Sequence, residues 1–147
     1  MKFPSVEWFE ALEKQAEQNA ATFRRLGFCD AIVGVKVLAG NGASENRGFV
    51  LTFDGYSCKS VEEVADPENV ADFVLEAKLS AWKEMIENIT ANGGADLGHT
   101  LNYLTLPGDP IRVIAKDQLK DDVFSRFNST FQEFFDGAQH LQTEFSG

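Results

Sequence analysis

Cysteine and histidine are the residue types that most often carry nucleophilic or metal chemistry, and the chain has two of each. Cys29, Cys58, His99 and His140 lie far apart and form neither a Cys-x-x-Cys nor a His-x-x-x-His spacing. A nucleophilic site would need a histidine as its base, and His140 is close to the C-terminus, where a solvated side chain is expected. The sequence therefore predicts no metal, no other cofactor and no catalytic residue.

His99 is the histidine that leaves an alternative open. It stands between Gly98 and Thr100, just after Asp96, and we expect it to make a polar contact inside a pocket. A small enzyme in which His99 and Asp96 transfer a proton on an apolar substrate is the weaker hypothesis. The main prediction is a protein that is not an enzyme.

Charge and composition exclude several classes of function. The chain has 13 basic and 23 acidic residues, a net charge of −10, which repels nucleic acid. It shows no secretory leader and no apolar run long enough to span a bilayer. We expect a cytoplasmic protein that is not integral to a membrane, with both cysteines as free, buried thiols.

Periodicity predicts a single domain over residues 1–147 in which helices and strands are mixed. Helices are expected at 5–26, 79–92, 96–104 and 121–141, and strands at 28–38, 47–53, 56–61, 71–77 and 111–115. The Gly- and Asn-rich segment 40–46 and the segment 107–110 are predicted turns, and the acidic run 62–68 a solvated loop.

Phenylalanine is unusually frequent, with 13 Phe against two Tyr and two Trp. In the last predicted helix, rings at Phe124, Phe127, Phe131, Phe134 and Phe135 fall within an arc of about 100°. Each ring would contribute on the order of 1.5 to 3 kcal/mol if buried, so this face is not expected to stay in water.

That aromatic face has three possible destinations: the core of the protein, a partner protein, or a ligand cavity. Two further apolar helical faces favour a cavity, because large rings and an adaptable methionine are typical linings for hydrocarbon ligands. The first face holds Trp82, Met85, Ile86 and Ile89, and the second Leu97, Leu101 and Leu104.

The order of elements resembles the sterol carrier protein type two superfamily over about the whole chain. The best-matching stretches are 71–77, running into Leu79-Ser80-Ala81-Trp82, and 111–117, running into the last helix. The resemblance implies an α+β fold. Its five-stranded, mostly antiparallel sheet would be covered by an N-terminal helix, two short central helices and a C-terminal helix, with a hydrophobic tunnel between them.

By this resemblance, the tunnel takes sterols, fatty acyl chains or similar molecules. The residues implied as its lining are Trp82, Met85, Ile86, Leu101, Leu104, Phe124, Phe127, Phe131 and Phe135. Arg112, with Asn102 or Tyr103, is a candidate polar anchor for a head group. The predicted function is a non-catalytic carrier of a lipid-like ligand. The alternative is an accessory or dimerisation module that presents an aliphatic substrate to a partner enzyme.

Overall fold

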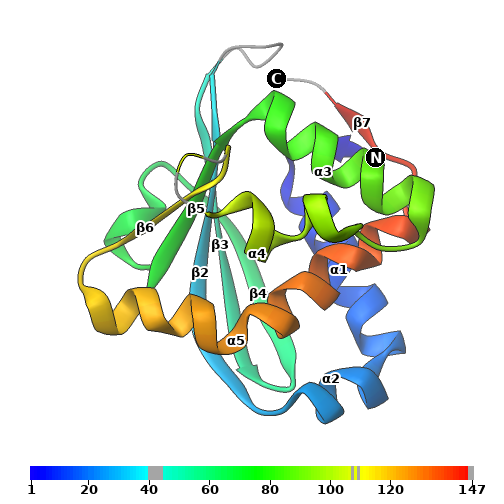
Figure 1. Ribbon diagram of the computed structural model, residues 1–147, viewed down its shortest axis with the longest axis horizontal. Coiled ribbons are helices and arrows are strands. Elements are labelled where there is room, and N and C mark those ends of the chain that lie inside the picture. The colour runs from blue at the N-terminus through cyan, green and yellow to red at the C-terminus, as the bar shows by residue number, and fades with distance from the viewer. Residues whose placement is uncertain (40–44, 107, 109, 146–147) are drawn as a thin grey trace.

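The computed structural model describes residues 1–39, 45–106, 108 and 110–145, and its centre is a five-stranded sheet (Figure 1). The strands are β2 (Cys29–Leu38), β3 (Arg47–Gly55), β4 (Ser57–Val64), β5 (Phe73–Lys78) and β6 (Arg112–Ala115). Their order in the sheet is β4-β3-β2-β5-β6. Within this sheet β2 and β5 pair in parallel, and the other neighbouring strands are antiparallel. The predicted α+β fold with a mostly antiparallel sheet is confirmed.

The helices gather over one face of this sheet (Figure 1). They are α1 (Val6–Gln18), α2 (Ala20–Leu26), α3 (Leu79–Asn92), α4 (Leu101–Leu104) and α5 (Gln118–Asp136). Short 3-10 turns lie at η1 (Pro67–Asn69), η2 (Leu97–His99) and η3 (Gly137–His140). The helices cover this face because every second side chain of β2, at Val33, Val35 and Val37, is apolar and points toward them into the core.

The predicted N-terminal helix is interrupted at Asn19, whose backbone leaves helical geometry (φ −112°, ψ 32°). The Asn19 side chain donates a hydrogen bond to Glu133 of α5 at 2.9 Å, which is a tertiary contact that periodicity does not reveal. Before the break, the Ser5 hydroxyl accepts from the Trp8 N–H and caps α1. The buried face of α1 holds Trp8, Phe9, Leu12 and Ala16.

Two central predictions also need correction. Residues 62–64 are not loop but the end of edge strand β4, where Glu63 pairs with Arg47 across the sheet at 2.8 Å. The predicted helix 96–104 splits at Thr100 into η2 and α4, because the extended Thr100 caps α4 by accepting from the Tyr103 N–H. Leu97, expected on an apolar face, is 82% exposed.

The chain ends differ from expectation as well. The last helix begins at Gln118, ahead of the predicted 121, and gives way to η3 after Asp136. Two short strands that the sequence did not predict, β1 (Lys2–Phe3) and β7 (Glu144–Phe145), pair in parallel and bring the two ends of the chain together. Of the predicted turns, residues 40–44, 107 and 109 lie outside the described residues.

The second face of the sheet is covered in part by η1, and two glycines permit this contact. A Cβ on Gly48 would lie 2.6 Å from the Val64 carbonyl oxygen and 2.7 Å from Pro67 Cδ. A Cβ on Gly34 would lie 2.8 Å from Val74 Cγ2. All three distances are far below van der Waals contact, and the Gly34 Cβ would also lie 3.2 Å from Pro67 Cβ, so the close approach of Pro67 depends on glycine at these positions.

We predict that Gly48→Ala lowers the free energy of unfolding by about 1 to 3 kcal/mol, because the new methyl group overlaps backbone and a rigid proline ring. Urea denaturation measures the loss. Gly98→Ala is the matched control, since its nearest neighbour is an Asp96 oxygen at 3.8 Å, and it should change stability by less than about 0.5 kcal/mol. Equal stability of Gly48→Ala and the unsubstituted protein would contradict the close packing of η1.

Candidate functional site

The candidate site is the apolar layer between the sheet and the helices α3, α4 and α5. The sheet contributes Phe49, Leu51 and Phe53 from β3 and Phe73, Leu75 and Ala77 from β5, all at most 2% exposed. Cross-strand register places Phe49, Val35 and Leu75 in one row, so these residues form a continuous floor. The sequence identified these strands but did not assign their rings to the site, although their alternation was visible.

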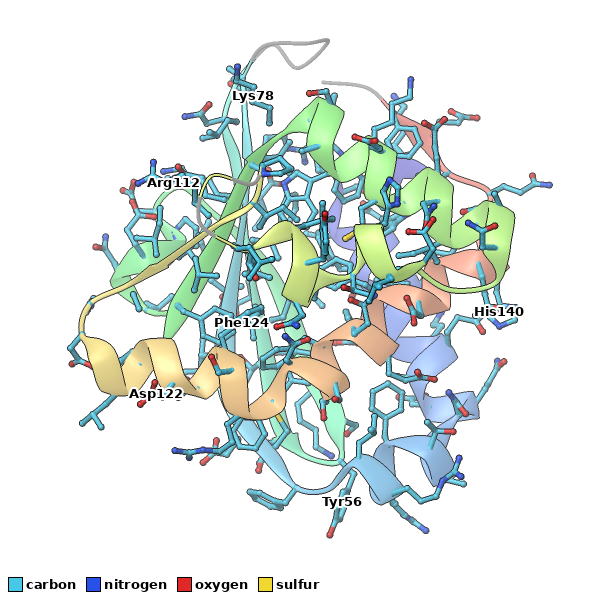
Figure 2. The ribbon with its side chains drawn as sticks, viewed as in Figure 1. Tyr56, Lys78, Arg112, Asp122, Phe124 and His140 are labelled. Atoms are coloured by element: carbon cyan, nitrogen blue, oxygen red, sulfur yellow. The ribbon has the colours of Figure 1, made fainter. Side chains whose placement is uncertain are left out.

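α5 lays its phenylalanines directly on this floor. The Phe131 ring lies 5.3 Å from the Phe53 ring and 5.5 Å from the Phe73 ring, measured between centroids. Phe124 points from α5 toward the strands (Figure 2) and meets Phe73 edge-on at 5.4 Å. Phe124 is 5% exposed, and Phe131, Phe134 and Phe135 are each 1% exposed. Such edge-to-face pairs each add about 0.5 to 1.5 kcal/mol beyond burial.

α3 closes a second side of the layer. Trp82 stacks on Phe135 with centroids 5.9 Å apart, and its indole N–H donates to the Lys36 carbonyl at 3.2 Å. That hydrogen bond satisfies the indole nitrogen and fixes the ring against β2. Met85 and Ile86, on the same face of α3, are fully buried. The apolar face predicted for this helix is buried.

α4 is a four-residue helix that covers the rings, and it is called the roof below. The Leu101 N–H donates to the Gln132 side chain of α5 at 2.6 Å, and the Asn128 amide donates to Asn102 at 3.3 Å. Leu101 and Leu104 point inward and are 0% and 9% exposed. A helix this short has little stability of its own, so its place depends on these contacts.

Phe127 is the exception among the predicted lining residues. Its backbone is not helical (φ −109°, ψ 16°), and α5 bends there, although the sequence has no proline or glycine at that point. The ring is half-buried and the Arg126 guanidinium lies over it at 5.8 Å. The bend separates an N-terminal segment over Phe73 from a C-terminal segment over Phe53.

All the predicted lining residues thus belong to, or pack against, one apolar cluster. The side chains touch one another in this structure. Of the predicted lining residues, Ile86 borders a hollow that is open to the surface, between α3 and residues 141–145. Four rings of the aromatic face of α5 are buried within one chain, at Phe124, Phe131, Phe134 and Phe135, and the Phe127 ring is half-buried.

The sequence also missed an N-terminal contribution to this cluster. Phe3, Trp8 and Phe9 are fully buried, and Phe9 packs on Phe49 at 5.0 Å and on Phe135 at 6.4 Å. The apolar spacing of the first helix was recognised, but its destination was not. Only the closure of the fold brings residues near position 9 against residues near position 135.

The polar candidates lie at the margin of the site. His99 does not line any of the hollows described; its Nδ1 lies 2.7 Å from Asp96 and its Nε2 lies 3.4 Å from Glu84. The Asp96 carboxylate raises the pKa of His99, and the two hydrogen bonds from His99 and Asn88 lower the pKa of Asp96. The expected polar contact exists, but on the surface between α3 and η2 and not inside a pocket.

The cysteines behave as expected, since both are free and buried. Burial raises the pKa of Cys29 to about 12 and also raises the pKa of Cys58, so neither thiol is activated at neutral pH. Among the residues described, no group of three His, Cys, Asp or Glu side chains is placed to hold a metal ion. The helices described include none long and apolar enough to cross a bilayer.

Comparison with known proteins identifies the fold of the chain. No family model matches the chain, and no curated protein sequence matches it. A conserved hypothetical protein of Thermus thermophilus, a possible sterol carrier protein, superposes with a TM-score of 0.71 at 17% identity, covering 95% of this chain and 90% of that one. Sterol carrier protein 2 superposes with a TM-score of 0.69 at 18% identity, covering 94% and 98%.

These similarities, together with the sheet order and the helical layer, define the class: the chain has the sterol carrier protein 2 fold. The resemblance predicted from the order of elements is confirmed at the level of the fold. At 17% and 18% sequence identity, these similarities show the fold alone and not the ligand.

We predict that Gln132→Ala loosens α4 without unfolding the protein. The Leu101 N–H loses its acceptor, so the free energy of unfolding should fall by about 1 kcal/mol and amide hydrogen exchange should accelerate across residues 101–104. Gln139→Ala is the matched control, because its side chain bonds only within its own turn, to the Asp136 carbonyl. Unchanged amide hydrogen exchange at residues 101–104 would show that Gln132 does not stabilise α4.

We also predict a pH dependence from His99. Because its pKa is raised in the folded state, its stabilising effect is complete below the unfolded pKa of about 6.5 and is lost as pH rises through the folded value. The stability difference between the unsubstituted protein and His99→Gln should therefore shrink between pH 6 and pH 8.5. It should not exceed about 1 kcal/mol, because the pair is partly exposed. A pH-independent difference in urea titrations would contradict the Asp96 pairing.

Proposed function

We propose that this protein binds one elongated apolar molecule, such as a sterol or a fatty acyl chain, between the sheet and helices α3, α4 and α5. It holds this ligand without converting it and acts as a carrier. The proposed lining is the set predicted from the sequence: Trp82, Met85, Ile86, Leu101, Leu104, Phe124, Phe127, Phe131 and Phe135. A cytoplasmic location is part of the proposal and fits the two free thiols.

The observation that carries the proposal is the aromatic seam formed by Phe73, Phe124 and Phe131 under a weakly held roof. The three rings contact one another with centroid distances of 5.4 to 6.3 Å. The roof is α4, a single helical turn, and Phe124 lies on the N-terminal segment of α5, before the bend at Phe127. The sterol carrier protein 2 fold adds support, because that protein's name describes a sterol carrier.

Binding requires this closed layer to open, and the energies permit it. Each buried CH₂ group of a ligand contributes about 0.8 kcal/mol, so a chain of a dozen such groups gains on the order of 10 kcal/mol before costs. Moving α4 breaks the Leu101–Gln132 and Asn128–Asn102 hydrogen bonds and the bond from the Ile111 N–H to the Leu104 carbonyl, each worth about 1 kcal/mol. The flexible Met85 side chain can change rotamer to make room.

Native mass spectrometry of freshly purified protein is the direct test. We expect a population carrying a bound apolar molecule that organic solvent extraction recovers, and displacement of a fluorescent fatty acid by unlabelled sterol or fatty acid. A spectrum of empty protein, combined with no binding of the fluorescent fatty acid, would overturn the proposal.

Two phenylalanine variants distinguish a residue that contacts the ligand from one that only packs in the core. Phe124→Leu and Phe49→Leu should each destabilise the fold by about 1 to 2 kcal/mol, because both rings are buried. Only Phe124→Leu should weaken binding of the fluorescent fatty acid, by about tenfold, which corresponds to about 1.4 kcal/mol. If both variants weaken binding equally, the ligand does not lie against α5.

A further inference from the structure

A hollow away from the aromatic layer combines an apolar floor with basic side chains. It has a volume of about 370 Å³ and lies where β2 and β5 end, beside the first turn of α3 and the start of β6. Its floor is formed by Leu38, Ala77 and Ala81, and the small size of the two alanine side chains leaves the space. This volume is at the lower end of the range for small-molecule sites.

The rim of the hollow carries Lys78 and Arg112, and Figure 2 shows these residues at one end of the molecule. Arg112 is 73% exposed and lies 3.7 Å from Glu76, a loose pair that leaves most of its donors in solvent. Within the described ranges, no carboxylate is at ion-pair distance from Lys78. The nearby Lys36 is paired with Glu68 at 3.7 Å.

This charge arrangement stands out against the rest of the protein. The chain as a whole carries a net charge of −10, yet among the described residues that line the hollow there are two cations and one carboxylate. A guanidinium offers paired donors that match a carboxylate or phosphate, and an ammonium adds a point charge. The apolar floor below them suits a hydrocarbon segment attached to that anion.

We propose that this hollow binds an amphiphilic anion, with its carboxylate or phosphate group between Lys78 and Arg112 and its hydrocarbon against Leu38, Ala77 and Ala81. Glu76 turns the Arg112 guanidinium toward the sheet when the hollow is empty and releases it when the anion binds. The site is separate from the aromatic layer under α5, so it does not depend on the carrier function proposed above.

Amide chemical shifts followed during titration with octanoate, below its micelle concentration, test the proposal. We expect saturable shifts at Ala77, Ala81 and Arg112. Octyl glucoside, which has the same tail without charge, and inorganic phosphate, which has charge without a tail, should each bind at least about fivefold more weakly. If phosphate or octyl glucoside saturates these amides as well as octanoate does, the proposal of an amphiphilic anion is overturned.

A pair of double variants tests the two cations. Lys78→Gln with Arg112→Gln should raise the octanoate dissociation constant at this site by at least about fivefold, and high salt should weaken binding to the unsubstituted protein. Arg24→Gln with Lys59→Gln removes the same charge from another hollow and should leave the constant unchanged. Equal affinity of the first double variant and the unsubstituted protein overturns the proposal. Shifts confined to Phe124 and Phe131 would also overturn it, while supporting binding under α5.

Discussion

Removal of the α5 phenylalanines from water is the constraint on which the rest of the structure depends. Phe131 and Phe134 both reach Phe53, and Phe124 and Phe131 both reach Phe73, so one helix joins two strands that are not neighbours in the sheet. Because these rings carry no polar group, they can be buried without hydrogen-bond partners. The helix α3 then packs where Phe135 presents its face to Trp82.

The same constraint divides the helical layer into a firmly held part and a weakly held part. The C-terminal segment of α5 packs on Phe53, Phe9 and Trp82 together. The N-terminal segment rests on fewer rings, and α4 above it is one turn of helix tied by side-chain amides. Local opening is expected where buried apolar contacts are fewest, so ligand entry under α4 is physically consistent with a stable sheet below.

Among the residues described, the buried polar side chain is Thr130 of α5, and charged groups lie at the borders of this layer. Gln132 connects α4 to Asp136, and burial raises the pKa of that carboxyl while its hydrogen bonds oppose the shift. His99 and Asp96 fasten η2 to α3 from the outside. A different hollow, at the N-terminal end of α3, is bordered by Lys78 and Arg112. The part of the interior that the structure describes under α5 is therefore largely apolar.

The sequence by itself determined most of the segments that become helices and strands and most of the apolar helix faces, because residues such as Val33, Val35 and Val37 repeat with the period of the element they form. It also determined that Phe124, Phe131 and Phe135 must leave water. Only the tertiary structure decided what they meet, since contacts such as Phe9 with Phe135 or Asn19 with Glu133 join residues more than a hundred positions apart. The breaks at Asn19, Thr100 and Phe127 were also not predicted, because local periodicity continues through them.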